Sequence, residues 1–295
     1  MEKSRNNVIT IGNFDGIHLG HREIIKTAER ISSGKKKGLI LITFTPNPKL
    51  FFKRIKKLIF TDKQKSEIFS SMNIERVEYL NFFDIYKLKG NEFIKNFLIE
   101  KFSMEYLVVG ENFKLGKERE CDIKKLKDME NELNFSLIVV PSVKLEGEKI
   151  SSTIIREHLS NGNIEKANVM LGRRFFIEGD IITGDKLGRK LGFPTINLLE
   201  ISTILANGVY ETETEIEDTV FDSITYIGAS PTLKNGEIIV ETHIFNFNHD
   251  VYGKKAKIYF KKKTRNEIKF TSEKKLIEQI KKDITGIKVD KKPLF

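Results

Sequence analysis

Residues 12–21 read GNFDGIHLGH and connect an apolar, strand-like segment, Val8–Gly12, to a segment with helical periodicity, Leu19–Ile31. The glycines at positions 12 and 16 allow a tight turn and a close approach of the backbone to a phosphate group. The start of the following helix offers free backbone N–H groups and the positive end of the helix dipole to an anion. The stretch therefore predicts a phosphate-binding strand–turn–helix unit.

Two histidines of this stretch are candidate catalytic groups. His18 and His21 are three residues apart, so on a helix they lie on one face and can hold one phosphate chain together. Their N–H groups can stabilise charge as a phosphoanhydride breaks, and because the stretch supplies no covalent nucleophile, direct attack by a second substrate is the simplest mechanism. The alternatives are two surface histidines or a partial metal site, which lacks further ligands. The neighbouring positions assigned to nucleotide binding are Gly12, Phe14, Asp15 and Gly16.

The first half of the chain alternates short apolar runs with helical segments. This alternation predicts a parallel sheet covered on both faces, with ligands at the carboxyl ends of its strands. The expected strands are Val8–Gly12, Gly38–Phe44, Val77–Leu80, Tyr106–Gly110 and Ser136–Pro141, and the expected helices are Leu19–Ile31, Asp62–Met72 and Glu92–Lys101.

The second half changes to closely spaced strands, which predicts an antiparallel barrel or sandwich. A helical stretch, Thr153–Met170, precedes the change, so we place the domain boundary between residues 1–171 and 172–295. The expected strands are Phe175–Thr183, Gly208–Ile216, Ile224–Gly228, Glu237–Phe247 and Lys255–Lys261, with a hairpin signal at Asn235-Gly236 and a last helix at Ser272–Asp283.

Composition narrows the functional class. The 295 residues suit two domains, and a single cysteine, Cys121, excludes a disulfide framework and fits a reducing compartment. No apolar run is long enough to span a bilayer, so we expect a soluble cytoplasmic protein without a membrane partner. The formal net charge is +10, but 40 of the 51 basic residues are lysine. Solvated surfaces explain most of this charge, and no nucleic-acid partner is expected because no RRM, KH or zinc-finger pattern accompanies it.

Two further segments of the first half could meet a nucleotide. Residues 110–117 follow a strand and include Asn112, although alone they read as an ordinary polar loop. Ser152 and Thr153 open a helix and read first as N-capping residues. Arg156 follows in the first turn, where the helix dipole disfavours a cation unless an anion is bound. This position therefore favours phosphate binding by Arg156.

The second half holds its own candidate site. Residues 184–195 are glycine-rich and basic, and their candidate phosphate-binding residues are Gly184, Lys186, Gly188 and Gly192; the alternative is a flexible surface loop. Thr195 and Asn197 are two residues apart and so share one face of a strand. Their oxygens suit Mg²⁺, which typically bridges nucleotide phosphates.

Glu241 lies in an apolar strand, where a lone carboxylate is costly unless it is paired or used. It could act as a general base on an alcohol that attacks a γ-phosphate. The alternative is a solvent-facing glutamate on a half-exposed strand.

Taken together, these segments resemble the bifunctional riboflavin kinase and FMN adenylyltransferase family, the prokaryotic FAD synthetases. The likeness runs in order through residues 12–21, 110–116, 151–156, 188–197, 241–247 and 265–270. It implies an N-terminal nucleotidyltransferase-type Rossmann domain that moves AMP from ATP to FMN, and a C-terminal barrel that phosphorylates riboflavin.

The resemblance also implies roles for single residues. His18, His21, Asn112, Ser152 and Arg156 would bind ATP or support adenylyl transfer. In the barrel, Thr195 and Asn197 would hold Mg-ATP, Glu241 would be the base on the ribityl hydroxyl, and Arg265 and Phe270 would lie near the flavin. The partners implied are riboflavin, FMN, FAD and ATP, with Mg²⁺ as cofactor, and we expect a monomer or weak homo-oligomer.

The chain departs from the family pattern at several positions. Asn47 stands where a histidine is common, Leu115 where an aromatic residue is usual, and Glu118–Cys121 where a glycine-bearing loop is usual. Ile196 and Asn246 replace an alanine and an aspartate. One alternative is an enzyme whose main product is FMN because one half is weak. Another is a flavin-sensing regulator that binds RNA through its lysines, which would need a basic groove with stacking aromatic residues.

Overall fold

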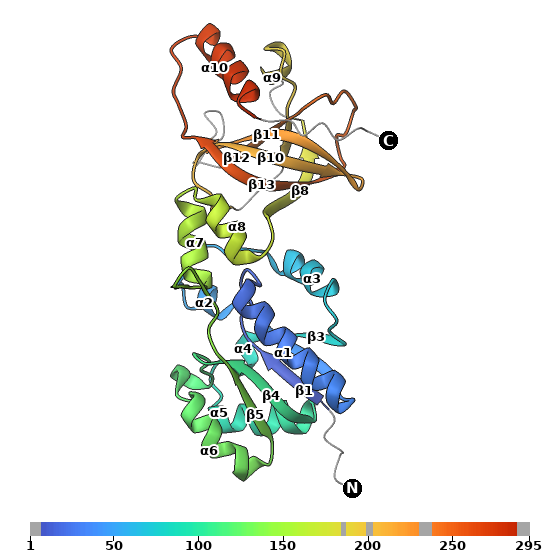
Figure 1. Cartoon of the computed structure of the whole chain (residues 1–295), viewed down its shortest axis with the longest axis vertical. Helices are drawn as coiled ribbons and strands as arrows, with labels where there is room; N and C mark the ends of the chain where they lie inside the picture. The colour runs from blue at the N-terminus through green and yellow to red at the C-terminus, as the bar shows by residue number, and fades with distance from the viewer. Residues whose placement is uncertain (1–6, 184–186, 199–202, 230–237, 288–295) are drawn as a thin grey trace. The chain divides into compact units, whose positions relative to one another are not determined.

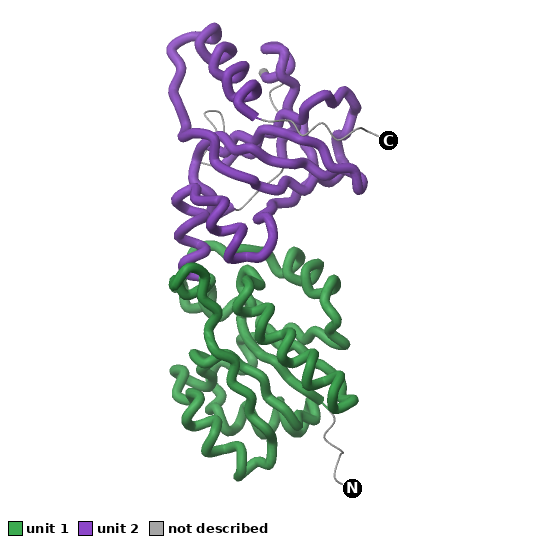
Figure 2. Tube along the Cα trace, viewed as in Figure 1, with its two compact units in different colours: residues 1–152 green, residues 153–295 purple. Residues whose placement is uncertain are grey.

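The computed structural model describes residues 7–183, 187–198, 203–229 and 238–287. The chain forms two compact units, Met1–Ser152 and Thr153–Phe295, which are described separately (Figure 2). No helix in the described segments is long and apolar enough to cross a membrane.

The first unit is built on the expected parallel sheet, with strand order β3-β2-β1-β4-β5 (Figure 1). All four neighbouring pairs are parallel. The strands are β1 (Asn7–Ile11), β2 (Gly38–Thr45), β3 (Arg76–Asn81), β4 (Met104–Gly110) and β5 (Ser136–Val140). Strand β1 is therefore central, and the carboxyl ends of all five strands lie along one edge, where ligands of such sheets bind.

Both faces of this sheet are buried, as the apolar strands predict. Ile9 and Ile11 pack in a cluster with Phe93 and Leu98, whereas Val8 packs with Ala28 on the opposite side. The helical elements are α1 (Leu19–Lys35), α2 (Pro48–Phe51), α3 (Asp62–Ser70), α4 (Phe82–Ile85), α5 (Gly90–Glu92), the π-helix η1 (Phe93–Lys101), the 3₁₀ turn η2 (Lys117–Arg119) and α6 (Ile123–Leu133). A short hairpin, β6 (Lys144–Leu145) and β7 (Glu148–Lys149), follows β5.

The second unit is a closed antiparallel barrel, so the barrel and not the sandwich is the fold. Its strand order is β10-β11-β12-β9-β8-β13, and β13 pairs with β10 to close it. The strands are β8 (Phe175–Ile182), β9 (Ile196–Leu198), β10 (Gly208–Ile216), β11 (Thr219–Ala229), β12 (Ile238–Ile244) and β13 (Lys255–Arg265). The helices are α7 (Ser152–Ser160), α8 (Ile164–Leu171), α9 (Leu187–Lys190) and α10 (Glu273–Thr285).

Several local predictions differ from the structure. The expected helix Thr153–Met170 is two helices, because the chain turns at Gly162 with a φ of 79°. Helix α6 was not expected from the periodicity, and the strand on which Thr195 and Asn197 were expected to share a face is the short β9, which contains Asn197 but not Thr195. The hairpin signal at Asn235-Gly236 lies outside the described residues.

Two candidate active sites

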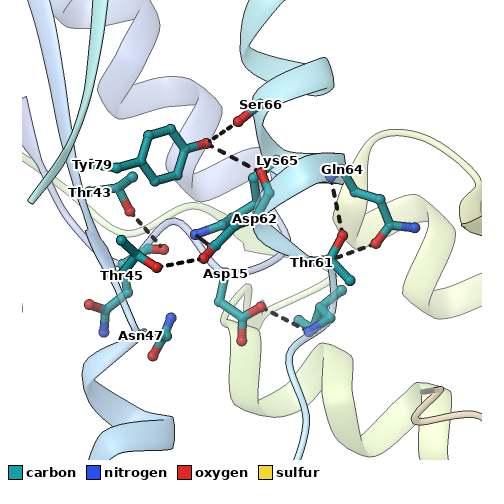
Figure 3. Close-up of polar contacts among 12 residues, drawn as sticks. Asp15, Thr43, Thr45, Asn47, Thr61, Asp62, Gln64, Lys65, Ser66 and Tyr79 are labelled. Carbon is teal, nitrogen blue, oxygen red and sulfur yellow. Dashed lines mark hydrogen bonds and ion pairs between the residues drawn. The ribbon is translucent and has the colours of Figure 1, made fainter. Parts of the chain in front are cut away.

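The turn after β1 is held rigidly by contacts from distant segments. Phe14 and Ile17 have positive φ angles of 45° and 42°, and Gly16 has a φ of 86°. The carboxylate of Asp15, which is buried, accepts a hydrogen bond from the backbone N–H of Ile59 at 2.9 Å (Figure 3). The hydroxyl of Ser152 donates to the backbone carbonyl of Asp15, also at 2.9 Å. In this structure Asp15 and Ser152 therefore shape the turn.

The two histidines meet at the start of α1, as their spacing predicts. Their rings stack with centroids 3.7 Å apart and an angle of 18° between the planes. His18 is the N-cap of α1, and its Nδ1 accepts a hydrogen bond from the backbone N–H of His21 at 3.3 Å. Because Nδ1 is an acceptor in this contact, the neutral ring of His18 carries its proton on Nε2. His18 can thus donate a hydrogen bond at the carboxyl end of β1.

Apolar and small residues hold the histidine pair in place. Phe14 is buried, and its ring meets the ring of His21 edge to face at 5.3 Å and that of Phe69 at 6.0 Å. A Cβ atom on Gly20 would lie 3.2 Å from two atoms of the His18 ring. A Cβ atom on Gly12 would lie 3.4 Å from the ring of Phe14. Phe14 therefore packs in the core and supports His21 from within.

A polar cluster beside the turn fixes α3 against the ends of β2 and β3 (Figure 3). The hydroxyl of Thr45 donates to Asp62 Oδ2 at 3.0 Å, and Lys65 Nζ pairs with Asp62 Oδ1 at 2.9 Å. The side chain of Lys65 is fully buried, and a buried charge is stable in a fold only when it is paired. The hydroxyls of Tyr79 and Ser66 are hydrogen-bonded at 2.7 Å. Sequence reasoning missed this cluster because its members come from three separate elements.

Asn47, which replaces a common histidine of the family pattern, has a structural role here. It is 1 % exposed, and its Oδ1 accepts a hydrogen bond from the backbone N–H of Lys49 at 2.9 Å. It thereby caps the short helix α2, a function for which asparagine is well suited. Leu115, another departure, is buried and pairs with Cys121 through two backbone hydrogen bonds of 2.9 and 3.1 Å.

The remaining candidates of the first site lie outside the turn after β1. Asn112 is exposed just after β4, beside Glu111, and the neighbouring residue Ser142 follows β5. Thr153 is exposed and Arg156 half-buried in α7, which belongs to the second unit from Thr153 onward. The structure thus brings His18, His21 and Asn112 to carboxyl ends of neighbouring parallel strands.

In the barrel, the candidate base and a candidate metal ligand are cross-strand partners. Glu241 on β12 lies opposite Asn197 on β9 and opposite Tyr226 on β11. Ile196 and Leu198 are buried whereas Asn197 is half-buried, so Asn197 points away from the barrel interior. The same alternation along β12 places Glu241 on that outer face, since Val240 and Thr242 are buried. This pairing could not be read from the sequence, because the register of the two strands was unknown.

A cavity of about 60 Å³ is lined by Ile196 and Thr242, the sequence neighbours of Asn197 and Glu241, and neither member of the pair is among its lining residues. Thr195 lines it together with Arg189, Thr242 and the aromatic side chains of Phe247 and Tyr252. Gly188 is the second residue of α9, and Gly192, in the loop between α9 and β9, has a φ of 87°. Gly184 and Lys186 lie outside the described residues. The oxygen donors of Thr195 and Asn197 fit Mg²⁺, which takes most of its ligands from phosphate and water.

Arg265 and Phe270 lie together, but the guanidinium of Arg265 is engaged by a residue that the sequence did not reveal. Its Nε donates to both carboxylate oxygens of Asp283 at 3.1 and 2.9 Å, and Nη2 lies 2.8 Å from Oδ2. The guanidinium carbon is 6.0 Å from the centre of the Phe270 ring. Gln279 Nε2 also donates to Asp283, at 2.7 Å. This network joins the end of β13 to α10.

Tyr226 is a further residue of the site that sequence reasoning missed. Its hydroxyl donates to Glu267, which also accepts a hydrogen bond from Asn207 Nδ2 at 3.2 Å. A Cβ atom on Gly228 would lie 2.0 Å from this hydroxyl, so the phenol ring requires glycine beneath it. Burial, and then the carboxylates of Glu267 and Glu241, raise the pKa of Tyr226 above its ordinary value. Tyr226 therefore stays protonated beside the candidate base.

Comparison with known proteins finds two family models that match successive parts of the chain. Residues 1–154 match the family model of FAD synthetase, and residues 171–289 match that of riboflavin kinase. A bifunctional riboflavin kinase/FMN adenylyltransferase from Buchnera aphidicola subsp. Schizaphis graminum is 38% identical, with 96% of this chain and 93% of the relative covered. The enzymes of the same name from Bacillus subtilis and Escherichia coli K12 are 34% and 31% identical. These matches cover 96% and 94% of this chain, and 92% and 90% of the relatives.

A solved structure shares the fold over nearly the whole chain. It is a crystal structure described as a macrolide-efflux protein from Streptococcus pneumoniae, with a TM-score of 0.86 and 28% sequence identity. The match covers 96% of this chain and 94% of that chain. With both family models matched in order and relatives above 30% identity along almost their full length, the chain belongs to the bifunctional riboflavin kinase/FMN adenylyltransferase family, which makes FMN from riboflavin and FAD from FMN.

Proposed function

We propose that the two activities are carried by two separate sets of residues, His18 and His21 for adenylyl transfer and Glu241 with Thr195 and Asn197 for riboflavin phosphorylation. The observation that carries this proposal is the geometry of the pairs. The two histidines stack at the N-terminus of α1, and Glu241 lies directly opposite Asn197 in the barrel. Each pair belongs to one unit, so each reaction has its own nucleotide site.

For adenylyl transfer, a phosphate oxygen of FMN attacks the α-phosphorus of ATP. A new P–O bond forms, the bond from the α-phosphorus to the bridging oxygen breaks, and pyrophosphate leaves. The proton on His18 Nε2 and the positive end of the α1 dipole can stabilise the negative charge that develops. His21 is held against His18 by stacking and by Phe14, so the donors are oriented before the substrate binds. Asn112, Thr153 and Arg156 are proposed as further ATP ligands.

For riboflavin phosphorylation, Glu241 accepts the proton of the terminal ribityl hydroxyl. The resulting oxygen attacks the γ-phosphorus of ATP, and ADP leaves with the electrons of the broken P–O bond. Thr195 and Asn197 would hold Mg²⁺, which neutralises phosphate charge when it is bound. Phe247 and Tyr252 in the cavity lined by Thr195 offer apolar surface to the nucleotide, while Arg189 offers a positive charge. A monomeric or weakly associated cytoplasmic enzyme without a nucleic-acid partner remains the expectation from composition.

Two variants test this assignment in opposite directions. His18→Ala/His21→Ala, given riboflavin, ATP and Mg²⁺, is expected to accumulate FMN, because loss of a preorganised charge stabiliser costs about 10²–10³-fold. Glu241→Gln is expected to lose FMN formation by about 10²–10⁴-fold and to keep FAD formation from supplied FMN. Chromatographic separation of the flavins measures both. If either variant, while folded, loses both activities or neither, the assignment of that site is wrong.

A further inference from the structure

The carboxylate of Glu111 joins three segments at the carboxyl edge of the first sheet. Its Oε1 accepts hydrogen bonds from the hydroxyl of Ser142, from Asn112 Nδ2 at 3.1 Å and from Lys149 Nζ at 3.2 Å. Glu111 and Asn112 follow β4, Ser142 follows β5, and Lys149 belongs to the β6–β7 hairpin. These hydrogen bonds, first those from Ser142 and then those from Lys149 and Asn112, lower the pKa of Glu111 to about 2. Glu111 is therefore ionised at neutral pH and can only accept hydrogen bonds.

The hydrogen bond between Asn112 and Glu111 sets the orientation of the Asn112 side-chain amide. A carboxylate offers no proton, so Asn112 must direct its NH₂ group toward Glu111. A second, longer contact from Nδ2 to the hydroxyl of Ser142, at 3.5 Å, lies on the same side. Because the oxygen and nitrogen of an amide point in different directions, Oδ1 of Asn112 faces away from Glu111. The group that Asn112 offers to a ligand is thus a hydrogen-bond acceptor.

An acceptor at this position is selective for one part of a nucleotide. Phosphate oxygens at neutral pH are themselves acceptors and would be repelled by Oδ1. The donors of ATP are the 6-amino group of adenine and the ribose hydroxyls, all in its nucleoside half. Strand β4 lies next to β1, whose turn holds the histidine pair proposed for the phosphates. Asn112 is therefore suited to the nucleoside and the β1 turn to the phosphates.

We propose that Glu111 is a positioning residue that holds Asn112 with its amide oxygen toward the nucleoside half of ATP, where it accepts a hydrogen bond from the adenine amino group or a ribose hydroxyl. The inference rests on the proposed role of Asn112 in ATP binding. The competing explanation is that Glu111 only links surface segments, since exposed ion pairs such as Glu111–Lys149 contribute little to stability.

The test measures FAD formation from supplied FMN with four nucleotides. ATP is compared with ITP, which has an oxo group in place of the 6-amino group, and with 2′-deoxy-ATP and 3′-deoxy-ATP. The full-length parent, Glu111→Ala, Glu111→Gln and Asn112→Ala are assayed for kcat/KM. Glu132→Ala is the matched control, because it also removes an exposed carboxylate, near the end of α6 and before β5 begins.

We expect the parent to prefer ATP over one analogue by about 10-fold, the usual scale of one well-placed hydrogen bond. Glu111→Ala and Asn112→Ala should lower kcat/KM for ATP by about this factor and leave kcat/KM for that analogue unchanged. The ratio of the two kcat/KM values should therefore fall toward one. Unchanged turnover of the analogue also shows that the variant is folded. Glu111→Gln, which keeps an acceptor oxygen, and Glu132→Ala should retain the preference. The analogue for which the parent's preference for ATP disappears in the variants identifies the group of ATP that donates the hydrogen bond to Asn112.

Three results would overturn the inference: a parent that treats all four nucleotides alike, a Glu111→Ala variant that slows all four equally, and one that changes none. A parent that makes no FAD from FMN and ATP would instead refute the proposed function and the inference with it.

Discussion

Gly20→Ala is expected to separate the activity of the first site from the stability of its helix. Gly20 is the second residue of α1, and an added Cβ would lie 3.2 Å from both Cε1 and Nδ1 of His18. Such a contact is tighter than ordinary van der Waals contact, so a neighbour must move by a few tenths of an ångström. His18 is only 5 % exposed, stacks on His21 and accepts a hydrogen bond from its backbone. The ring therefore has to shift within its site.

The magnitude follows from two opposing effects. Alanine in a helix is favoured over glycine by about 0.5–1 kcal/mol in the interior and by less in the first turn. A displacement of about 1 Å at a reacting centre can cost about 100-fold in rate, so a few tenths of an ångström should cost roughly 5-fold to 10-fold. We expect FAD formation from FMN to fall by this factor while the thermal unfolding temperature is unchanged or higher. Riboflavin phosphorylation should keep its parental rate.

Gly34→Ala is the matched control in the same helix. Nothing lies within 4 Å of the Cβ that it would add, so it should bring the helix-forming gain of alanine without loss of activity. The two variants are compared by initial rates of FAD formation and by circular dichroism melting. If Gly20→Ala has full adenylyltransferase activity, or if Gly34→Ala loses as much, the proposed role of the His18 ring is refuted.

Three further predictions concern the barrel and the free thiol. Gly188→Ala places a Cβ 2.4 Å from the carbonyl oxygen of Phe193 and should lower riboflavin phosphorylation at least about 10-fold with FAD formation from FMN preserved, as flavin chromatography can check. Asp283→Asn leaves Arg265 without its charge partner and should lower the barrel's free energy of unfolding in urea by about 2–3 kcal/mol. This is less than the ~3–5 kcal/mol that breaking a fully buried ion pair costs, because Arg265 is partly exposed. An unchanged midpoint of urea unfolding would contradict this prediction. Burial raises the pKa of Cys121 from 9.0 to about 11, so its thiolate at pH 8 is about 100-fold scarcer than in the unfolded chain. Because the thiol is also fully buried, alkylation by iodoacetamide should be slower by at least that factor and should speed up as the pH rises.

The sequence predicts those features that rest on local pattern. Strand β10 has the expected bounds, Gly208–Ile216, because alternation and flanking turn residues mark it clearly. The turn after β1 and the helix that follows it were predicted because the glycines and histidines that define them are neighbours in the chain. Helix α6 was missed although a signal was present, since Asp122 caps it by accepting from two backbone N–H groups.

Contacts between distant segments could not be predicted from the pattern. The hydroxyl of Ser152 was expected to meet a phosphate, but the structure shows it bonded to the carbonyl of Asp15, and any role in ATP binding remains a prediction. The pairing of Glu241 with Asn197 and Tyr226 depends on strand register, and a shift by one residue would turn Glu241 into the barrel. Residue types therefore indicated the chemistry, whereas packing determined which of them meet.

Contacts between helix α8 and the barrel bear on where the kinase unit begins. The change of periodicity predicts a boundary after Leu171, but Asn168 on α8 is bonded to two barrel strands. Its Nδ2 donates to the carbonyl of Phe260 on β13 at 2.8 Å, and its Oδ1 accepts from the backbone N–H of Phe175 on β8 at 2.7 Å. The α8 residues Ile164, Ala167, Met170 and Leu171 are also buried.

A fragment that begins at Gly172 loses these contacts, whereas one that begins at Thr153 keeps them. Two lost hydrogen bonds alone cost about 1–3 kcal/mol, and the exposed apolar surface adds to this. We therefore expect residues 153–295 to unfold cooperatively and to phosphorylate riboflavin, and residues 172–295 to unfold at a temperature at least about 5 °C lower or to aggregate. Calorimetry and the flavin assay on both fragments measure the difference. Equal stability and activity of the two fragments would show that α7 and α8 are dispensable and that the boundary after Leu171 is the correct one.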